Sequence, residues 1–206
     1  MKFTLDQMKA KEADNQGGYI NTSGKYTGKI KTFEFGQFDS GSQYVEIGFE
    51  SQDKQSASMC VITLKKDGTE SSYGVNKIHA LMTCLKIRES SMQKETRKKY
   101  DYNSRAEIDK VVYFAPEFEG KEVGFLIEMK GYTNSNREYK EKPSLVASFE
   151  PQGEFTAKEI LDKATKPEKL AELVATMQNR KPKTPKPQQQ SQGYGNQPQS
   201  DDDLPF

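Results

Sequence analysis

Alternating apolar and polar residues dominate the first half of the chain and predict β-strands. Three such runs are rich in Tyr, Phe, Ile, Val and Thr and are separated by turn-forming residues: 25–35, 43–50 and 58–64. Asp67-Gly68 follows the third run and predicts a tight turn, because glycine readily adopts the positive φ that such a turn requires. We therefore expect a further strand at 70–73 that returns beside its neighbour.

Helical spacing replaces strand alternation after this turn. Apolar residues recur every three or four positions between Val75 and Leu85, which predicts an amphipathic helix over 75–87. A long polar loop is expected at 89–109. Strand patterns then resume in three segments: 110–115, 122–132 and 144–149.

Two short helices are predicted at the end of the patterned region. Thr156 and Glu159 have the spacing of a capping box, in which each residue satisfies the other's backbone N–H, and they predict a helix over 156–164. Pro167 suits a first helical turn and opens a second helix that ends near Gln178. The folded region is expected to end there.

Short strands, one intervening helix and a single small core indicate a mainly β domain. The best specific candidate is an OB-fold-like antiparallel barrel with an inserted helix, C-terminal helices and a disordered tail, although a half-open sandwich would show similar periodicity. With 206 residues, of which 33% are hydrophobic, the chain can form one modest core. The expected divisions are an N-terminal arm at 1–23, the domain at 24–178, a linker at 179–200 and a tip at 201–206.

The tip is the most distinctive segment of the chain. Its acidic run ends in apolar residues and follows a Gln-, Gly- and Pro-rich stretch that cannot form a core. A tail that only aids solubility does not need exposed apolar residues, so the pattern favours a peptide that a partner protein recognises through a basic groove, a pocket for the ring and a cation for the terminal carboxylate. The predicted protein-interaction residues are Asp201, Asp202, Asp203, Leu204, Pro205 and Phe206.

DDDLPF, preceded by QQQSQGYGNQPQS, resembles the tail of bacterial single-stranded DNA-binding proteins, in which a similar linker ends in Asp-Asp-Asp-Ile-Pro-Phe. The stretch from Pro116 to Met177, with EFEGKEVGFLIEMKGYT and FTAKEILDKATKPEKLAEL, resembles phage-type proteins of that function. The start of the chain does not resemble the bacterial housekeeping proteins. The resemblance favours an OB fold and implies sequence-independent binding of single-stranded DNA, with the tip recruiting replication, recombination or repair proteins.

Single-strand binding requires cations for phosphates and flat rings on which bases stack. Three segments interleave the two kinds: the first strand, the polar loop and a predicted hairpin region at 130–142. The predicted DNA contacts are Lys29, Lys31, Phe33, Arg97, Lys98, Lys99, Tyr100, Tyr102, Arg105, Lys130, Tyr132, Arg137, Tyr139 and Lys140. Two alternatives stay open: Phe33 would belong to the core while the neighbouring lysines extend to water, and 130–142 would be only a solvated hairpin tip.

Nothing in the sequence indicates catalysis. There is no GxxxxGK[ST] phosphate loop or compact acidic cluster, and the one histidine, His79, falls within the helical pattern. Cys60 and Cys84 lie in apolar patterns and are expected to be small buried side chains, without a disulfide, metal or cofactor. We therefore expect a protein that is not an enzyme. The alternatives are a recombination mediator or annealing protein, or an adaptor, that uses the same tip.

The net charge of +1 conceals a separation of charge, with cations in the folded body and aspartates in the tip. This separation suggests that the tip competes with DNA for the basic surface of the body. The N-terminus lacks the apolar run of a signal peptide or membrane span. The expected location is the cytoplasm of a bacterial cell, with a phage gene as one origin, and with no membrane partner. Sheet edges and the apolar helix face are compatible with a homo-oligomer.

Overall fold

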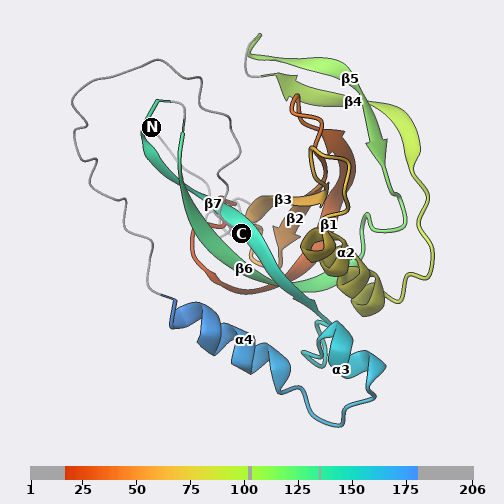
Figure 1. The fold of residues 1–206 in the computed structure, drawn as a ribbon, viewed down its shortest axis with the longest axis vertical. Helices are drawn as coiled ribbons and strands as arrows, with labels where there is room; N and C mark the ends of the chain where they lie inside the picture. Colours follow the sequence, from red (N-terminus) through yellow and green to blue (C-terminus); the bar gives the residue numbers. More distant parts are fainter. Residues whose placement is uncertain (1–16, 102–103, 135, 181–206) are drawn as a thin grey trace, which may run out of the picture.

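The computed structural model describes residues 17–101, 104–134 and 136–180 (Figure 1). Within these residues seven strands form one antiparallel sheet with the order β3-β2-β1-β5-β4, and β6 pairs with both β1 and β7. The strands are β1 Gly24–Gln37, β2 Gln43–Ser51, β3 Ser56–Leu64, β4 Gln93–Asp101, β5 Ala106–Phe114, β6 Glu122–Thr133 and β7 Tyr139–Phe149. The predicted mainly β fold is confirmed.

The long strand β1 joins the two halves of the curled sheet. Its residues from Gly28 to Gln37 pair with β2, while Gly24–Lys29 pairs with β6 on the other side. A register shift between Ile30 and Thr32 interrupts the pairing with β2, and such irregularities bend a strand. Because β7 pairs with β6 and lies against β3, strands β1, β2, β3, β7 and β6 surround one core as a partly open, OB-like barrel.

Aromatic side chains fill the barrel. Phe33 stacks on Phe118 with ring centroids 3.8 Å apart, and Phe49 meets Phe125 edge-on with centroids 5.0 Å apart. All four rings are buried. The prediction that Phe33 contacts DNA is therefore wrong, because its ring is enclosed by the core, as in the alternative that the sequence left open.

Helix α2, Ser72–Leu85, follows β3 and closes one end of the barrel, and Leu81 on its inner face is fully buried. Its close approach requires glycine at position 74, because a Cβ there would lie 1.7 Å from the carbonyl oxygen of Ile62. The turn at Asp67-Gly68 forms as expected. The strand expected at 70–73 does not form, because Glu70 makes only an isolated bridge and the helix begins two residues later.

Helices α3, Ala157–Leu161, and α4, Lys169–Gln178, are fastened together by one buried carboxylate. Glu159 accepts hydrogen bonds from the backbone N–H and hydroxyl of Thr156 at 2.8 and 2.7 Å, which is the predicted capping box. Its other oxygen accepts the N–H groups of Glu168 and Lys169, both at 2.7 Å. Although desolvation opposes it, these hydrogen bonds lower the pKa of Glu159 to about 2.

The polar loop expected at 89–109 is largely a hairpin, which corrects the sequence prediction. β4 and β5 pair in continuous register from Gln93–Phe114 to Asp101–Ala106. Charged and polar side chains occupy both faces of β4, so its sequence lacks the alternation that identifies a half-buried strand. In Figure 1 this hairpin and the β6–β7 hairpin both extend from the barrel at the end opposite α3 and α4.

Several predicted segments lie outside the described residues: 1–16 of the arm, Tyr102, the linker from 181 onward and the tip at 201–206. The rest of the arm packs on the barrel, where Ile20 is buried and Tyr19 forms a parallel bridge with Ser56. Within the described part of the chain, no helix is long and apolar enough to span a membrane.

Candidate nucleic-acid interface

Arg97 fastens the β4–β5 hairpin to the barrel. Its Nη1 and Nη2 donate hydrogen bonds to the two carboxylate oxygens of Glu119 at 2.7 and 2.9 Å, and Nη1 also lies 3.3 Å from Glu34 Oε1. The guanidinium carbon is 4.1 Å from the ring centroid of Phe114. The hydrogen bonds to Glu119 raise the pKa of Arg97 above its ordinary value. Because carboxylates occupy these donors, Arg97 is poorly placed to bind phosphate.

The two faces of this hairpin differ in what they contact. Residues two positions apart on one strand share a face, as do residues paired across strands. Arg97 and Lys99 therefore point to the same side, where Lys99 Nζ lies 2.8 Å from Glu34. The opposite face turns to solvent, and Lys94 Nζ there lies 5.9 Å from the ring centroid of Tyr113. We call this the outer face of the β4–β5 hairpin. It also carries two exposed carboxylates, because Asp109 pairs with Lys98 and Glu107 pairs with Tyr100, and its residues are Lys94, Thr96, Lys98, Tyr100, Glu107, Asp109, Val111 and Tyr113.

Exposed rings and cations therefore interleave on the outer face. Tyr100 is 55% exposed and Tyr113 is 43% exposed, while Lys98 is an exposed cation with no ion pair among the described residues. Arg105 is exposed in the turn, where its φ of 53° places it in the left-handed region. The structure thus brings Lys98, Tyr100 and Arg105 to one exposed hairpin.

The β6–β7 hairpin presents one exposed tyrosine on each face: Tyr132 shares its face with Lys130, Lys140 and Lys142, whereas Tyr139 lies on the opposite face beside Glu141. Tyr132 and Tyr139 are 38% and 45% exposed, and Lys142 Nζ lies 5.3 Å from the Tyr132 ring centroid. The Tyr139 ring covers Gly131, where an added Cβ would come within 2.2 Å of its hydroxyl oxygen. This contact holds the ring against the hairpin and leaves part of it open to solvent.

The cations predicted on this hairpin are mostly paired. Lys130 Nζ is 3.8 Å from Glu128, and Lys140 Nζ is 3.2 Å from Glu138. Arg137 occupies the turn with a φ of 62° and is exposed. Exposed pairs of this kind contribute little to stability, so their lysines remain available to a competing anion.

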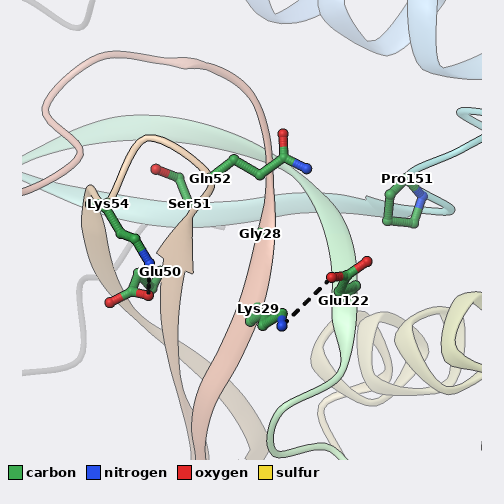
Figure 2. A pocket seen from close by; sticks show the side chains of 8 residues that line it. All are labelled: Gly28, Lys29, Glu50, Ser51, Gln52, Lys54, Glu122 and Pro151. Atoms are coloured by element: carbon green, nitrogen blue, oxygen red, sulfur yellow. Dashed lines mark hydrogen bonds and ion pairs between the residues drawn. The ribbon is translucent and has the colours of Figure 1, made fainter. Parts of the chain in front are cut away.

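Lys29 and Lys31 lie away from both hairpin tips. Figure 2 shows Lys29 pointing toward Glu122 in a polar pocket, with Nζ 3.7 Å from the carboxylate. Lys31 Nζ is 3.9 Å from Glu50, which also pairs with Lys54. Since Glu122 begins β6 and the hairpin tip follows its other end, the structure does not bring these lysines together with the exposed tyrosines.

Aromatic residues on the barrel exterior were missed at the sequence level. Phe38 is 44% exposed in the β1–β2 turn, and its ring centroid is 4.3 Å from that of Tyr44 on β2. The phenylalanine between Gly36 and Gly41 was a usable signal, because an apolar ring in a turn has no core to enter. Tyr113 was concealed by buried neighbours on both sides, which made its strand look like a core element.

The exterior between the hairpins is not uniformly basic. Glu46 on β2 accepts a hydrogen bond from the Ser58 hydroxyl at 2.6 Å, and Glu34 is held by Arg97 and Lys99. Cys60 also lies on this exterior and is exposed, which corrects the expectation that both cysteines are buried, whereas Cys84 is buried. Desolvation by the surrounding protein raises the pKa of Cys60 to about 11, so its thiol stays neutral near pH 7.

Among the described residues, no group of three or more His, Cys, Asp or Glu side chains is arranged to hold a metal ion. His79 lies exposed on α2. No protein-family model matches the sequence, and the search of curated proteins finds no match either. The candidate interface consists of two hairpins that carry exposed tyrosines and cations on one end of an OB-like barrel.

Proposed function

We propose that this protein binds single-stranded DNA without sequence preference and recruits replication, recombination or repair proteins through its acidic C-terminal tip. The observation that carries the proposal is the pair of projecting hairpins with exposed tyrosines beside lysines. Tyr100 and Tyr113 share a face of β4–β5 with Lys94 and Lys98, and Tyr132 shares a face of β6–β7 with Lys130, Lys140 and Lys142. Every base has a π-face, so such rings bind unpaired strands of any sequence, whereas bases in a duplex are already stacked. The OB-like barrel supports the proposal as a common scaffold for this task.

The tyrosines and lysines divide the work of binding. Each ring that stacks on a base contributes about 1–3 kcal/mol, and lysines such as Lys94 and Lys98 neutralise phosphates. Arg97 acts instead as a positioning residue, since its hydrogen bonds to Glu119 hold the hairpin in place. The tip at 201–206 belongs to the proposal on its sequence alone, as a recognition peptide on a flexible linker that brings partners to the coated strand.

The test is a fluorescence-anisotropy titration of a labelled oligo-dT strand with the full-length chain, at low and high salt, with duplex DNA as competitor. We expect tight binding that weakens steeply with salt and that duplex does not displace. Absence of binding at low salt would overturn the proposal and favour the adaptor alternative, in which only the tip has a partner.

Paired tyrosine variants locate the interface. Replacing Tyr100 and Tyr113 together with serine should weaken binding at least tenfold, because two stacking rings are lost. Tyr73→Ser is the matched control, since that ring is 62% exposed but lies on α2, away from the hairpins. Equal losses in the hairpin and control variants would show that the hairpin rings are not the stacking surface. A recombination mediator would bind in the same way and would be distinguished by accelerating the annealing of complementary strands.

A further inference from the structure

A second surface lies among the helices, at the other end of the barrel from the hairpin tips. A pocket opens there between α2, β7, α3 and α4, and we call it the helical pocket. Its apolar wall is formed by Ala80 of α2, Val146 of β7 and Leu173 of α4. The wall is held in place by Glu159, whose carboxylate ties the start of α3 to the start of α4. The pocket is thus a feature of the fold that the DNA-binding proposal does not use.

The charged residues that line the pocket are all lysines. Lys77, Lys158 and Lys169 contribute to its lining, and none of its lining residues is Asp or Glu. Lys77 is half-buried, donates to the carbonyl of Leu145 and lies 4.0 Å from the Tyr73 ring centroid. Lys158 pairs with Asp162, and Lys169 pairs with Glu172 at 2.5 Å, both at exposed sites where a pair is readily exchanged. An anionic ligand with an apolar part matches this lining.

We propose that the helical pocket holds the chain's own C-terminal tip, Asp201–Phe206. The tip combines three carboxylates and a terminal carboxylate with Leu204 and Phe206, which complements three lysines and an apolar wall. The tether is long enough: roughly two dozen residues follow Arg180, and a flexible coil of that length spans about 28 Å root-mean-square. This span exceeds the distance to be covered, because the pocket residue Leu173 lies five residues before the last residue of α4, Gln178, or about 8 Å along the helix.

Docking at this site gives the tip a different role from competition with DNA. The pocket is lined by helices and the barrel end of β7, whereas the exposed tyrosines lie on the hairpins. A docked tip would therefore be withheld from partner proteins without blocking the proposed DNA surface. The docking does not depend on DNA binding, so either proposal can fail while the other holds.

Zero-length carbodiimide cross-linking of the full-length chain tests the docking. The reagent joins carboxylates to amines in direct contact, and peptide mapping by mass spectrometry identifies the pairs. We expect the monomer fraction to contain links from Asp201–Asp203 to Lys158, Lys169 or Lys77. Links to hairpin lysines such as Lys98 instead, or no links from the tip, would overturn the proposal. A mixture of isotopically heavy and light chains shows whether a link joins two copies of the protein. Links between a heavy and a light chain would also overturn the proposal.

Matched variants separate specific docking from random collision. Leu173→Glu places a carboxylate in the pocket and should reduce the links at least fivefold, and Phe206→Ala should do the same by removing the ring. Leu161→Glu is the control, because that leucine is 70% exposed on α3 and does not line the pocket. Ala80→Glu tests the opposite wall if Leu173→Glu loosens α4. Unchanged links in Leu173→Glu, Ala80→Glu and Phe206→Ala would show that the tip does not occupy the pocket.

Discussion

The two hairpins project from the same end of the barrel but are attached to it in different ways. β6–β7 continues directly into the core, where Phe125, Leu126 and Ile127 are fully buried. β5 pairs with β1 at only two positions, Glu34 and Phe35, and Arg97 links the hairpin to Glu119. The β6–β7 hairpin is therefore held by the same apolar burial that stabilises the whole domain, whereas the β4–β5 hairpin is held largely by charged contacts.

This difference predicts that the free energy of local opening differs between the two hairpins. Apolar burial at the base of β6–β7 is shared with the barrel, so this hairpin should open only when the domain unfolds. The β4–β5 hairpin buries Val112 and Phe114 but leaves the rest of β5 exposed, which allows it to open locally. In the proposed function, such local opening would let the β4–β5 hairpin adjust to a flexible DNA strand.

The largest expected effect comes from the base of β6–β7. Phe125→Ala should lower the free energy of unfolding by about 3–5 kcal/mol, because it leaves a cavity against Phe49 in the barrel core. Urea unfolding followed by circular dichroism measures the change. Tyr132→Ala at the exposed end of the same strand should change it by less than about 0.5 kcal/mol. Similar values for the two variants would contradict the contrast between base and tip.

The second-largest effect is expected within the β4–β5 hairpin, as a loss of hydrogen-exchange protection. Arg97→Gln leaves Glu34 and Glu119 without their shared cation and should lower hydrogen-exchange protection of this hairpin by about 2 kcal/mol. Amides of β6–β7 should keep their protection. Lys98→Gln on the same strand serves as the control, since that lysine faces solvent. A uniform loss across both hairpins would mean that Arg97 supports the whole domain instead.

Salt dependence compares the hairpins as DNA-binding surfaces. Replacing Lys94, Lys98 and Arg105 with glutamine should flatten the slope of log affinity against log salt by up to about 2, since each phosphate neutralised on a single strand contributes about 0.7. The same change at Lys130, Lys140 and Lys142 should flatten it less, because two of these lysines already pair with glutamates. Anisotropy titrations at four salt concentrations measure the slopes. An unchanged slope in the first variant would exclude β4–β5 from the phosphate contacts.

The smallest effect concerns the helical end and depends on pH. Glu159→Gln should lower stability by about 1–2 kcal/mol at pH 7, because an ionised acceptor of four hydrogen bonds is replaced by a neutral one. The folded-state pKa of Glu159, about 2, lies below the ordinary value of 4.5. The advantage of the native residue is therefore complete above pH 4.5 and is lost as pH falls toward 2.

Thermal unfolding of both proteins between pH 2 and 7 measures this loss. Thr176→Ala is a suitable control on α4, since its hydroxyl donates only within its own helix. A difference between Glu159→Gln and the native chain that stayed constant down to pH 2 would contradict the low pKa.

Local patterns in the sequence predicted most elements of the fold. Alternation identified the barrel strands, helical spacing identified α2, and the capping box of Thr156 and Glu159 placed α3, because each of these signals involves residues close together in the chain. The prediction of a strand at 70–73 was wrong because the helix begins at Ser72, which leaves the returning segment too short for a strand. The β4–β5 hairpin was mistaken for a loop because both faces of β4 are polar.

Residue types and short-range spacing were enough to predict the strand-rich domain, the segments where rings and cations interleave, and the chemistry of the tip. Which of those residues face solvent depends on the three-dimensional fold. It buried Phe33 against Phe118, bound Arg97 to Glu119 and exposed Tyr113, through contacts between residues far apart in the chain. It also assembled the helical pocket from four separate elements. Such contacts arise from how the sheet curls, and no local pattern specifies them.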